Sequence, residues 1–139
     1  MYLLVSPYIY TSSGICLEDT SVLTLAGAEL IAHPSNLVLP FCPDAMPVRC
    51  LENMAFAITA NRIGTEQRNG KQPLTFIGKS EVVSPRGKIL IRAPEDDEAM
   101  MVVDIDPAEA RDKMLNQYNS ILKDRRPDQY TCLSDNLDK

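Results

Sequence analysis

Residues 27–66 read GAELIAHPSNLVLPFCPDAMPVRCLENMAFAITANRIGTE, and this stretch decides the fold. Residues 28–32 are apolar and predict a short strand, which should end in a loop at the proline and small polar residues of positions 33–36. A helix should follow this loop, and residues 56–60 predict the next strand. The order strand, loop, helix, strand is typical of α/β folds, whose functional sites usually lie at strand ends.

The helix predicted within this stretch lies between the two strands. Asp44 can cap its N-terminus, and Pro47 is tolerated in its first turn. Val48, Leu51 and Ala55 recur at helical spacing, so we expect these side chains on the buried face of the helix.

The residues before this stretch predict two short strands and a helix. Residues 2–5 and 8–10 are rich in strand formers, and residues 11–14 have the composition of a turn. Residues 18–26 place apolar side chains at helical spacing, and the two carboxylates of their first turn suit the helix dipole.

The residues after this stretch predict a mixed sheet that ends in an antiparallel meander. Its three strands should comprise residues 74–83, 88–93 and 100–105. Residues 84–87 have proline and glycine where a type I turn favours them, so they should form a hairpin. Residues 61–73 are polar and predict a loop. The acidic residues 95–98 should form the solvated tip of a second hairpin and not a metal site, because the spaced ligands of a calcium loop are missing.

The residues that follow the meander predict a long amphipathic helix. Asp106 can cap it, with Pro107 at its first position and Glu109 at its third. Its apolar stripe should comprise Met114, Leu115, Tyr118, Ile121 and Leu122. Proline 127 should prevent further helix. We expect one domain over residues 1–130 and a polar C-terminal tail over residues 131–139.

Composition limits the classes of partner. The chain has 139 residues, a net charge of −5 and a pI near 4.8, which argues against nucleic acid or an anionic membrane as a partner. No apolar run is long enough to span a bilayer, and the N-terminal residues lack the pattern of a signal peptide. We therefore expect a cytoplasmic protein.

The four cysteines show no C-x-x-C pair and no regular framework. This pattern favours neither structural disulfides nor a metal site. The single histidine, His33, could complete a zinc site only if the fold brought it to Cys42 or Cys50. We expect no metal.

Four sequence blocks carry a resemblance to a known family. They are GAELIAHPSNLVLP at residues 27–40, RCLENMAFAITANRIGTE at 49–66, FIGKSEVVSPRGKIL at 76–90 and DRRPDQY at 124–130. In this order and spacing the blocks resemble the carbon–nitrogen hydrolase family, also called the nitrilase superfamily. The resemblance implies the C-terminal part of an α-β-β-α sandwich, and it implies no cofactor.

The resemblance also implies a chemistry. The family uses a Glu general base, a Lys that stabilises the oxyanion and a Cys nucleophile, which forms an acyl-enzyme from an amide, nitrile or carbamoyl group. The part that carries the family's Glu and Lys has no counterpart in this chain. One alignment places Thr11 at the nucleophile position, and we prefer it. The alternative makes Cys16 the nucleophile and requires a deletion in the helix that follows.

The loop after the first strand of the decisive stretch holds the candidate substrate-binding residues His33, Ser35 and Asn36. The resemblance places them at a strand end near the substrate of the family. Alternatively, His33 and Asn36 satisfy backbone groups in a turn, which Asn does well.

Two functions are consistent with these observations. The first is a hydrolase of non-peptide carbon–nitrogen bonds that is incomplete or inactive as an isolated chain. The second is a non-catalytic homo-oligomeric scaffold or interaction subunit that keeps the dimer surface of the family. We expect a homodimer or higher oligomer in either case, because a lone half of a sandwich exposes more apolar surface than soluble monomers tolerate.

Overall fold

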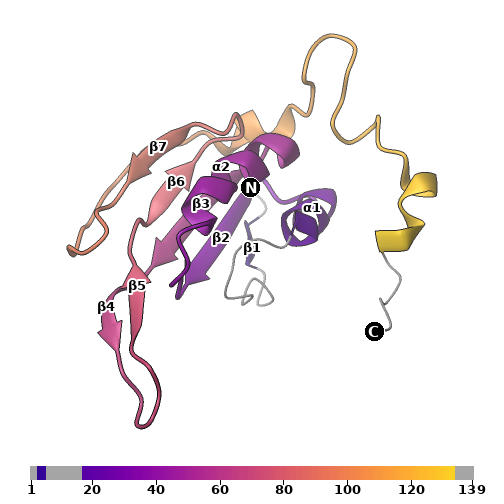
Figure 1. Cartoon of the computed structure of the whole chain (residues 1–139). Helices are drawn as coiled ribbons and strands as arrows, with labels where there is room; N and C mark the ends of the chain where they lie inside the picture. The colour runs from indigo at the N-terminus through magenta and orange to yellow at the C-terminus, as the bar shows by residue number, and fades with distance from the viewer. Residues whose placement is uncertain (1–2, 6–16, 134–139) are drawn as a thin grey trace.

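The computed structural model describes residues 3–5 and 17–133, and Figure 1 shows how their elements are arranged. The strands are β1 (Leu3–Val5), β2 (Leu30–Ser35), β3 (Phe56–Asn61), β4 (Ile63–Glu66), β5 (Leu74–Ile77), β6 (Glu81–Val83) and β7 (Ile89–Arg92). The helices are α1 (Leu17–Leu25), α2 (Cys42–Asn53) and the 3₁₀ turns η1 (Pro107–Arg111), η2 (Pro127–Gln129) and η3 (Thr131–Leu133). The residues predicted as a second strand, 8–10, and as a turn, 11–14, lie outside the described ranges. None of the described helices is both long and apolar enough to cross a membrane.

One mixed sheet organises the domain. Its strands lie in the order β1-β2-β3-β6-β7, with β1, β2 and β3 parallel and β6 and β7 antiparallel to their neighbours. The core on one face joins buried residues of these strands to α2, and α1 lies beside α2. On the other face Leu30 and Phe56 pack with Ala110 of η1. The α/β fold with a mixed sheet is confirmed.

The first strand of the decisive stretch is longer than predicted. β2 continues through His33 and Pro34 to Ser35, where the sequence predicted a loop. β1 pairs with β2 only as far as Ala32, so Pro34 has no partner strand on that side among the described residues. Sheets tolerate proline at such an edge position because no ladder donor is lost there. The strand therefore carries His33 and Ser35 as regular side chains of its carboxyl end.

The buried face of α2 differs from the predicted one. Cys42, Met46 and Cys50 recur every four residues and are buried, whereas Val48 and Leu51 are 46% and 44% exposed. The prediction was wrong for Val48 and Leu51 because it followed the larger aliphatic side chains, although sulfur-containing residues form the continuous stripe. Ala55 is buried as expected but lies beyond the end of the helix. The helix begins at Cys42, so the predicted cap, Asp44, lies in its first turn.

Pro47 lies inside α2 and not in its first turn. Proline has no N–H, so the Pro43 carbonyl, four residues earlier, receives no hydrogen bond from residue 47. Arg92 Nη2 donates to the Pro43 carbonyl oxygen at 2.8 Å. A side chain from β7 therefore replaces the missing helical bond and fixes α2 to the sheet.

The predicted meander is only partly confirmed. The hairpin of β6 and β7 turns at Ser84–Gly87, where Gly87 N donates to the Ser84 carbonyl at 2.9 Å. The predicted strand 74–83 is broken by the left-handed residues Gly78 and Lys79, with φ of 58° and 54°. Its first half, β5, pairs instead with β4, which forms within the predicted loop 61–73.

The third predicted meander strand, residues 100–105, is absent from the described structure. Met100 and Val102 are 97% and 85% exposed. The acidic residues 95–98 are accordingly not a hairpin tip. They form part of an exposed loop between β7 and η1.

The long C-terminal helix was also predicted wrongly. Asp106 caps as expected, accepting from Ala108 N at 2.9 Å, but the 3₁₀ turn η1 ends at Arg111. Lys113 Nζ donates to the carbonyl oxygens of Asn53 and Met54 at 3.0 and 2.7 Å, which satisfies the C-terminal end of α2. Side chains of Asp112 and Asn116 accept from nearby backbone N–H groups, and such bonds compete with helix.

Two glycine substitutions test how closely the β6–β7 turn packs on α2. Gly87 and Gly70 have similar left-handed φ angles of 72° and 74°, so alanine should strain both by about 1 kcal/mol. A Cβ at Gly87 would also lie 2.8 Å from the Pro47 carbonyl oxygen, whereas one at Gly70 meets nothing within 4 Å. We predict that Gly87→Ala lowers the free energy of unfolding by about 2 kcal/mol more than Gly70→Ala, measured by urea denaturation. Equal losses in the two variants would contradict this packing.

Candidate functional site

A row of polar side chains crosses four strands of the sheet. The polar row comprises His33 of β2, Thr59 of β3, Glu81 of β6 and Arg92 of β7, each in register with the next. Ile31, Ala57 and Val83, two positions along the same strands, belong to the core that includes α2. Because alternate residues of a strand share a face, the polar row lies on the α2 side of the sheet.

His33 joins two hydroxyl groups. Its ring is 1% exposed, with Nδ1 3.1 Å from Thr59 Oγ1 and Nε2 2.9 Å from Ser35 Oγ. Burial lowers the pKa of His33 below its usual 6.5, because the charged imidazolium loses its hydration. His33 is therefore a neutral, fixed imidazole at neutral pH.

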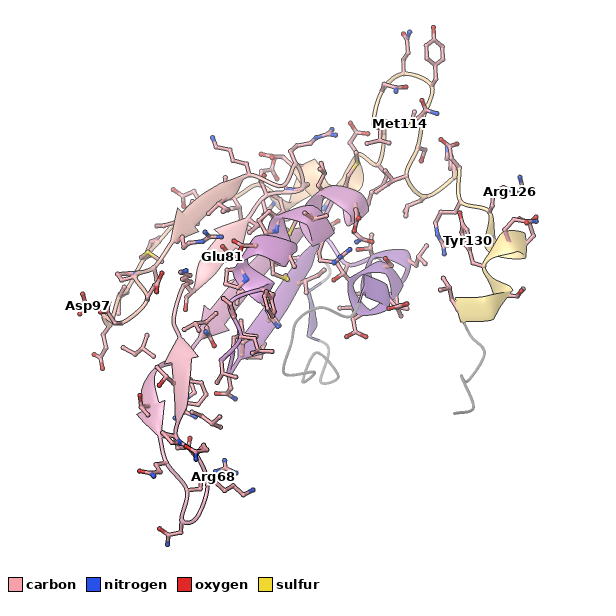
Figure 2. The ribbon with its side chains drawn as sticks, viewed as in Figure 1. Arg68, Glu81, Asp97, Met114, Arg126 and Tyr130 are labelled. Carbon is pink, nitrogen blue, oxygen red and sulfur yellow. The ribbon has the colours of Figure 1, made fainter. Side chains whose placement is uncertain are left out.

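Glu81 and Arg92 form an ion pair in the interior. Arg92 Nε and Nη2 lie 2.8 and 2.7 Å from Glu81 Oε2, and the Glu81 side chain is fully buried. Burial raises the pKa of Glu81, and the hydrogen bond and charge of Arg92 partly offset that rise. The second carboxylate oxygen, Oε1, is buried with no hydrogen-bond partner. Figure 2 shows Glu81 within the body of the domain, whereas Arg68, Asp97 and Tyr130 lie on outlying segments.

The two described free cysteines lie beside this pair and are not reactive thiols. Burial, and secondly the charge of Glu81, raise the pKa of Cys42 to about 11 and that of Cys50 to about 12. A thiol is nucleophilic as its thiolate, which these pKa values exclude near neutral pH. No group of three or more potential metal ligands occurs among residues 3–5 and 17–133.

Asn61, the last residue of β3, braces the loop that follows β2. Leu37 N donates to Asn61 Oδ1 at 2.7 Å, and Asn61 Nδ2 donates to the Gly78 carbonyl at 2.8 Å. Asn61 N also donates to Ser80 Oγ at 2.9 Å. A cavity of about 410 Å³ opens beside this brace, lined by Asn61, Ser80, Asp97 and Glu98 among others. The hydrogen bond from Leu37 N to Asn61 therefore fixes the loop that follows β2, whereas the cavity lies on the other side of Asn61, beside β4 and the loop after β7.

The structure brings His33 and Ser35 into contact, but the three predicted site residues differ in exposure. His33 is buried, Ser35 is half-buried and Asn36 is exposed, so only the last two reach the surface at the carboxyl end of β2. Both candidate nucleophiles, Cys16 and Thr11, lie outside the described residues.

Sequence reasoning did not identify four of the residues in this region. They are Thr59, Asn61, Glu81 and Arg92. The local sequence carries no clear signal for Glu81, because Lys79 and Ser80 precede it and a charge at the start of a strand is usually solvated. Its partner could not be named either, because pairing with Arg92 depends on the hairpin register.

Polar groups gathered at the carboxyl ends of parallel strands define an α/β domain of the kind in which enzymes build active sites. The family model for carbon–nitrogen hydrolases matches residues 15–113, and the chain belongs to that family. The resemblance read from the four sequence blocks is confirmed.

The curated relatives are longer than this chain. A nitrilase of Pyrococcus abyssi is 45% identical over 113 residues, which are 81% of this chain and 41% of the relative. An N-carbamoylputrescine amidase of Oryza sativa subsp. japonica is 34% identical over 144 residues, covering 91% of this chain and 47% of the relative. The chain thus spans less than half the length of these relatives.

Solved structures show the same fold. A carbon–nitrogen hydrolase from Helicobacter pylori G27 matches with a TM-score of 0.79 at 24% identity, covering 96% of this chain and 48% of that one. A mutant amidase from Nesterenkonia sp. AN1 matches with a TM-score of 0.64 at 27% identity, covering 91% and 41%. In that amidase the acetamide moiety of fluoroacetamide is covalently added at the active-site cysteine. The nitrilase-like α/β fold of this chain is therefore established.

Replacing Glu81 tests the buried ion pair. Burial raises the pKa of Glu81 in the folded protein above the usual 4.5, so the folded state binds this proton at higher pH than the unfolded chain. Protonation of Glu81 therefore adds stability as the pH falls through the raised pKa, and the gain is complete below about 4.5. Glu81→Gln lacks this gain. We predict that wild type gains stability relative to Glu81→Gln between pH 8 and pH 5 in urea denaturation.

Two further variants complete this test. Glu98→Gln removes an exposed carboxylate of the loop after β7 and serves as the control for the change in net charge. Glu81→Ala should cost about 2 kcal/mol at pH 7, because it leaves Arg92 without its buried partner. If the free energies of unfolding of wild type and Glu81→Gln differed by the same amount at every pH, the raised pKa of Glu81 would be contradicted.

Proposed function

We propose that this domain serves in the hydrolysis of non-peptide carbon–nitrogen bonds and that the isolated chain does not carry out the reaction. The substrate class is a small amide, nitrile or carbamoyl compound, as in the names of the relatives. The braced end of β2 is the observation that carries the proposal, since Asn61 fixes the loop that follows Ser35 and Asn36 at the carboxyl end of a parallel strand.

Ser35 and Asn36 would contact the substrate, and His33 would hold Ser35 from within. Ser35 and Asn36 are assigned to the substrate because they are at least partly exposed. His33 is not, because its buried ring already bonds two hydroxyl groups and has no free nitrogen for a ligand. Cys16 is the proposed nucleophile only if the chain is active alone. The preferred alignment places Thr11 there, and a hydroxyl without a positioned base is a poor nucleophile.

The low reactivity of two buried thiols supports the proposed inactivity of the isolated chain. Cys42 and Cys50 have raised pKa values and lie in the core, so neither can replace a missing nucleophile. A thiol that lacks a general base and an oxyanion donor also loses several orders of magnitude in rate. The missing general base and oxyanion donor would come from the portion of the relatives' domain to which this chain has no matching residues.

The first experiment measures ammonia release from simple amides, N-carbamoyl compounds and nitriles. The purified chain alone should release no more than an iodoacetamide-treated sample. Co-expression with the portion of the Pyrococcus abyssi nitrilase that this chain does not match should restore turnover. Asn36→Ala should lower the restored turnover about fivefold, because one substrate hydrogen bond contributes on the order of 1 kcal/mol.

Thiol-sensitive ammonia release by the chain alone would contradict its inactivity and would assign Cys16 as the nucleophile. Failure of the co-expressed pair on every substrate, with both parts soluble and associated, would argue against the hydrolase proposal.

A second candidate function is a non-catalytic homo-oligomeric scaffold, favoured by the apolar surface beside α1. Val22 and Leu25 of α1 are 62% and 47% exposed. Together with Tyr130 and Leu133 they line a groove of about 600 Å³. Figure 1 shows the yellow C-terminal segment beside α1 at the end of a long irregular connection. A second copy of the chain would cover this surface.

Charge placed in the groove tests the oligomer. Light scattering after gel filtration should show a dimer or larger assembly for wild type at about 50 µM, within the range of weak to moderate self-association. Leu25→Glu should shift the chain to monomer, because a buried, unpaired carboxylate opposes association. Leu74→Glu is the matched control, since Leu74 is 49% exposed on β5, away from the groove. A wild-type monomer, or equal effects of the two variants, would contradict the oligomer.

A further inference from the structure

The end of β2 contains the components of an activated hydroxyl group. Ser35 Oγ lies 2.9 Å from His33 Nε2, and the opposite ring nitrogen, Nδ1, lies 3.1 Å from Thr59 Oγ1. A nucleophile within hydrogen-bond reach of a base, with the base held by a third group, is the arrangement of nucleophilic catalysis. Residues two apart on a strand share a face, so β2 itself places Ser35 beside His33.

We propose that Ser35 is an acyl acceptor for activated carboxylic esters, with His33 as its general base and Thr59 as the residue that positions His33. This activity goes beyond carbon–nitrogen hydrolysis and requires no thiol. It therefore stands or falls independently of the proposed function.

The surroundings give each residue a distinct role. Ser35 is half-buried at the end of its strand, so the residue that carries the hydroxyl is partly open to solvent. His33 is 1% exposed and Thr59 3% exposed, which prevents both from rotating away. With its proton on Nδ1, His33 donates to Thr59 Oγ1 and leaves Nε2 to accept from Ser35. Burial also lowers the pKa of His33, so this acceptor stays unprotonated at neutral pH.

Ser35 has a second acceptor within reach. Its hydroxyl can donate to the His33 carbonyl oxygen, 3.2 Å away, as well as to Nε2 at 2.9 Å. The hydroxyl proton must point to Nε2 for the reaction, and the shorter of the two distances favours that orientation.

The reaction is balanced as an acyl transfer. Ser35 Oγ attacks the ester carbonyl carbon while His33 Nε2 takes the hydroxyl proton, and the bond from that carbon to the leaving oxygen breaks. The products are acyl-Ser35 and the leaving alkoxide or phenolate, and the proton passes from His33 to that oxygen or to water. Water then hydrolyses acyl-Ser35 to a carboxylate and the free hydroxyl. Phenol esters suit this site best, since a phenolate leaves without the prior protonation that an amine requires.

The test uses the full chain with its thiols blocked by iodoacetamide. p-Nitrophenyl acetate should give a burst of p-nitrophenolate close to one equivalent per chain. Diisopropyl fluorophosphate should label Ser35 in a peptide map. Ser80 is the internal control, because its hydroxyl bonds the backbone of Asn61 and not an imidazole. Ser35→Ala should abolish both the burst and the label, with circular dichroism confirming that the variant is folded.

Two further measurements test whether Ser35 reacts because His33 activates its hydroxyl or only because the side chain is exposed. His33→Gln should slow labelling at least about 100-fold, the lower range for a general base. Thr59→Val should slow it less, since the base remains but is held less firmly. The labelling rate of wild type should stay level from pH 8 to pH 6.5 and fall only at lower pH. Uncatalysed attack by a serine would instead slow with every unit of pH.

A label found equally on Ser80, or a burst that persists in Ser35→Ala, would overturn the proposal. The absence of a burst and label in folded wild type would overturn it as well. If His33→Gln does not fold, the pH profile and Thr59→Val still decide whether the imidazole acts as the base.

Discussion

The buried ion pair of Glu81 and Arg92 is the constraint on which much of this domain depends. A carboxylate loses its hydration beneath α2, so it requires a partner with charge and good geometry. Arg92 donates from Nε to one carboxylate oxygen, keeps Nη2 within ion-pair distance of the same oxygen, and donates from Nη2 to the Pro43 carbonyl. The register of β6 and β7 is therefore coupled to the position of α2. A slip of one residue would turn Glu81 to the opposite face and leave both groups unpaired.

The sequence predicted the elements whose signals are local. The α/β order, helix α1 and the hairpin turn at Ser84–Gly87 follow from periodicity, charge placement and turn residues within a few positions of one another. The wrongly predicted elements are those whose structure is determined by contacts between residues distant in the sequence. The stripe expected after Asp106 was helical in pattern, but Lys113 and Arg111 bond the Asn53 carbonyl and the Glu29 carboxylate instead. Such contacts outweigh a helix propensity of a few tenths of a kcal/mol per residue.

The candidate site shows the same division. Ser35 and Asn36 could be proposed from the sequence because they stand at the end of an apolar strand, and strand ends are where α/β folds place polar loops, although Ser35 proved to be the last residue of β2 itself. Thr59 and Arg92 could not, since they enter only through the pairing of β2 with β3 and of β6 with β7. Periodicity indicates which residues share a face of one strand, but it gives no relative offset between strands. The polar row is a property of the assembled sheet.

Burial beneath α2 acts in opposite ways on the acids and the base of this region. Removing water disfavours the charged form of every group. Cys42 and Cys50 consequently stay protonated, with pKa values of about 11 and 12, and are chemically silent. The same loss of hydration keeps His33 neutral, which is the form that accepts a proton. One environment thus suppresses these two thiols and preserves the imidazole, which is why the chemistry proposed for the described core rests on the Ser35 hydroxyl beside His33 and not on Cys42 or Cys50.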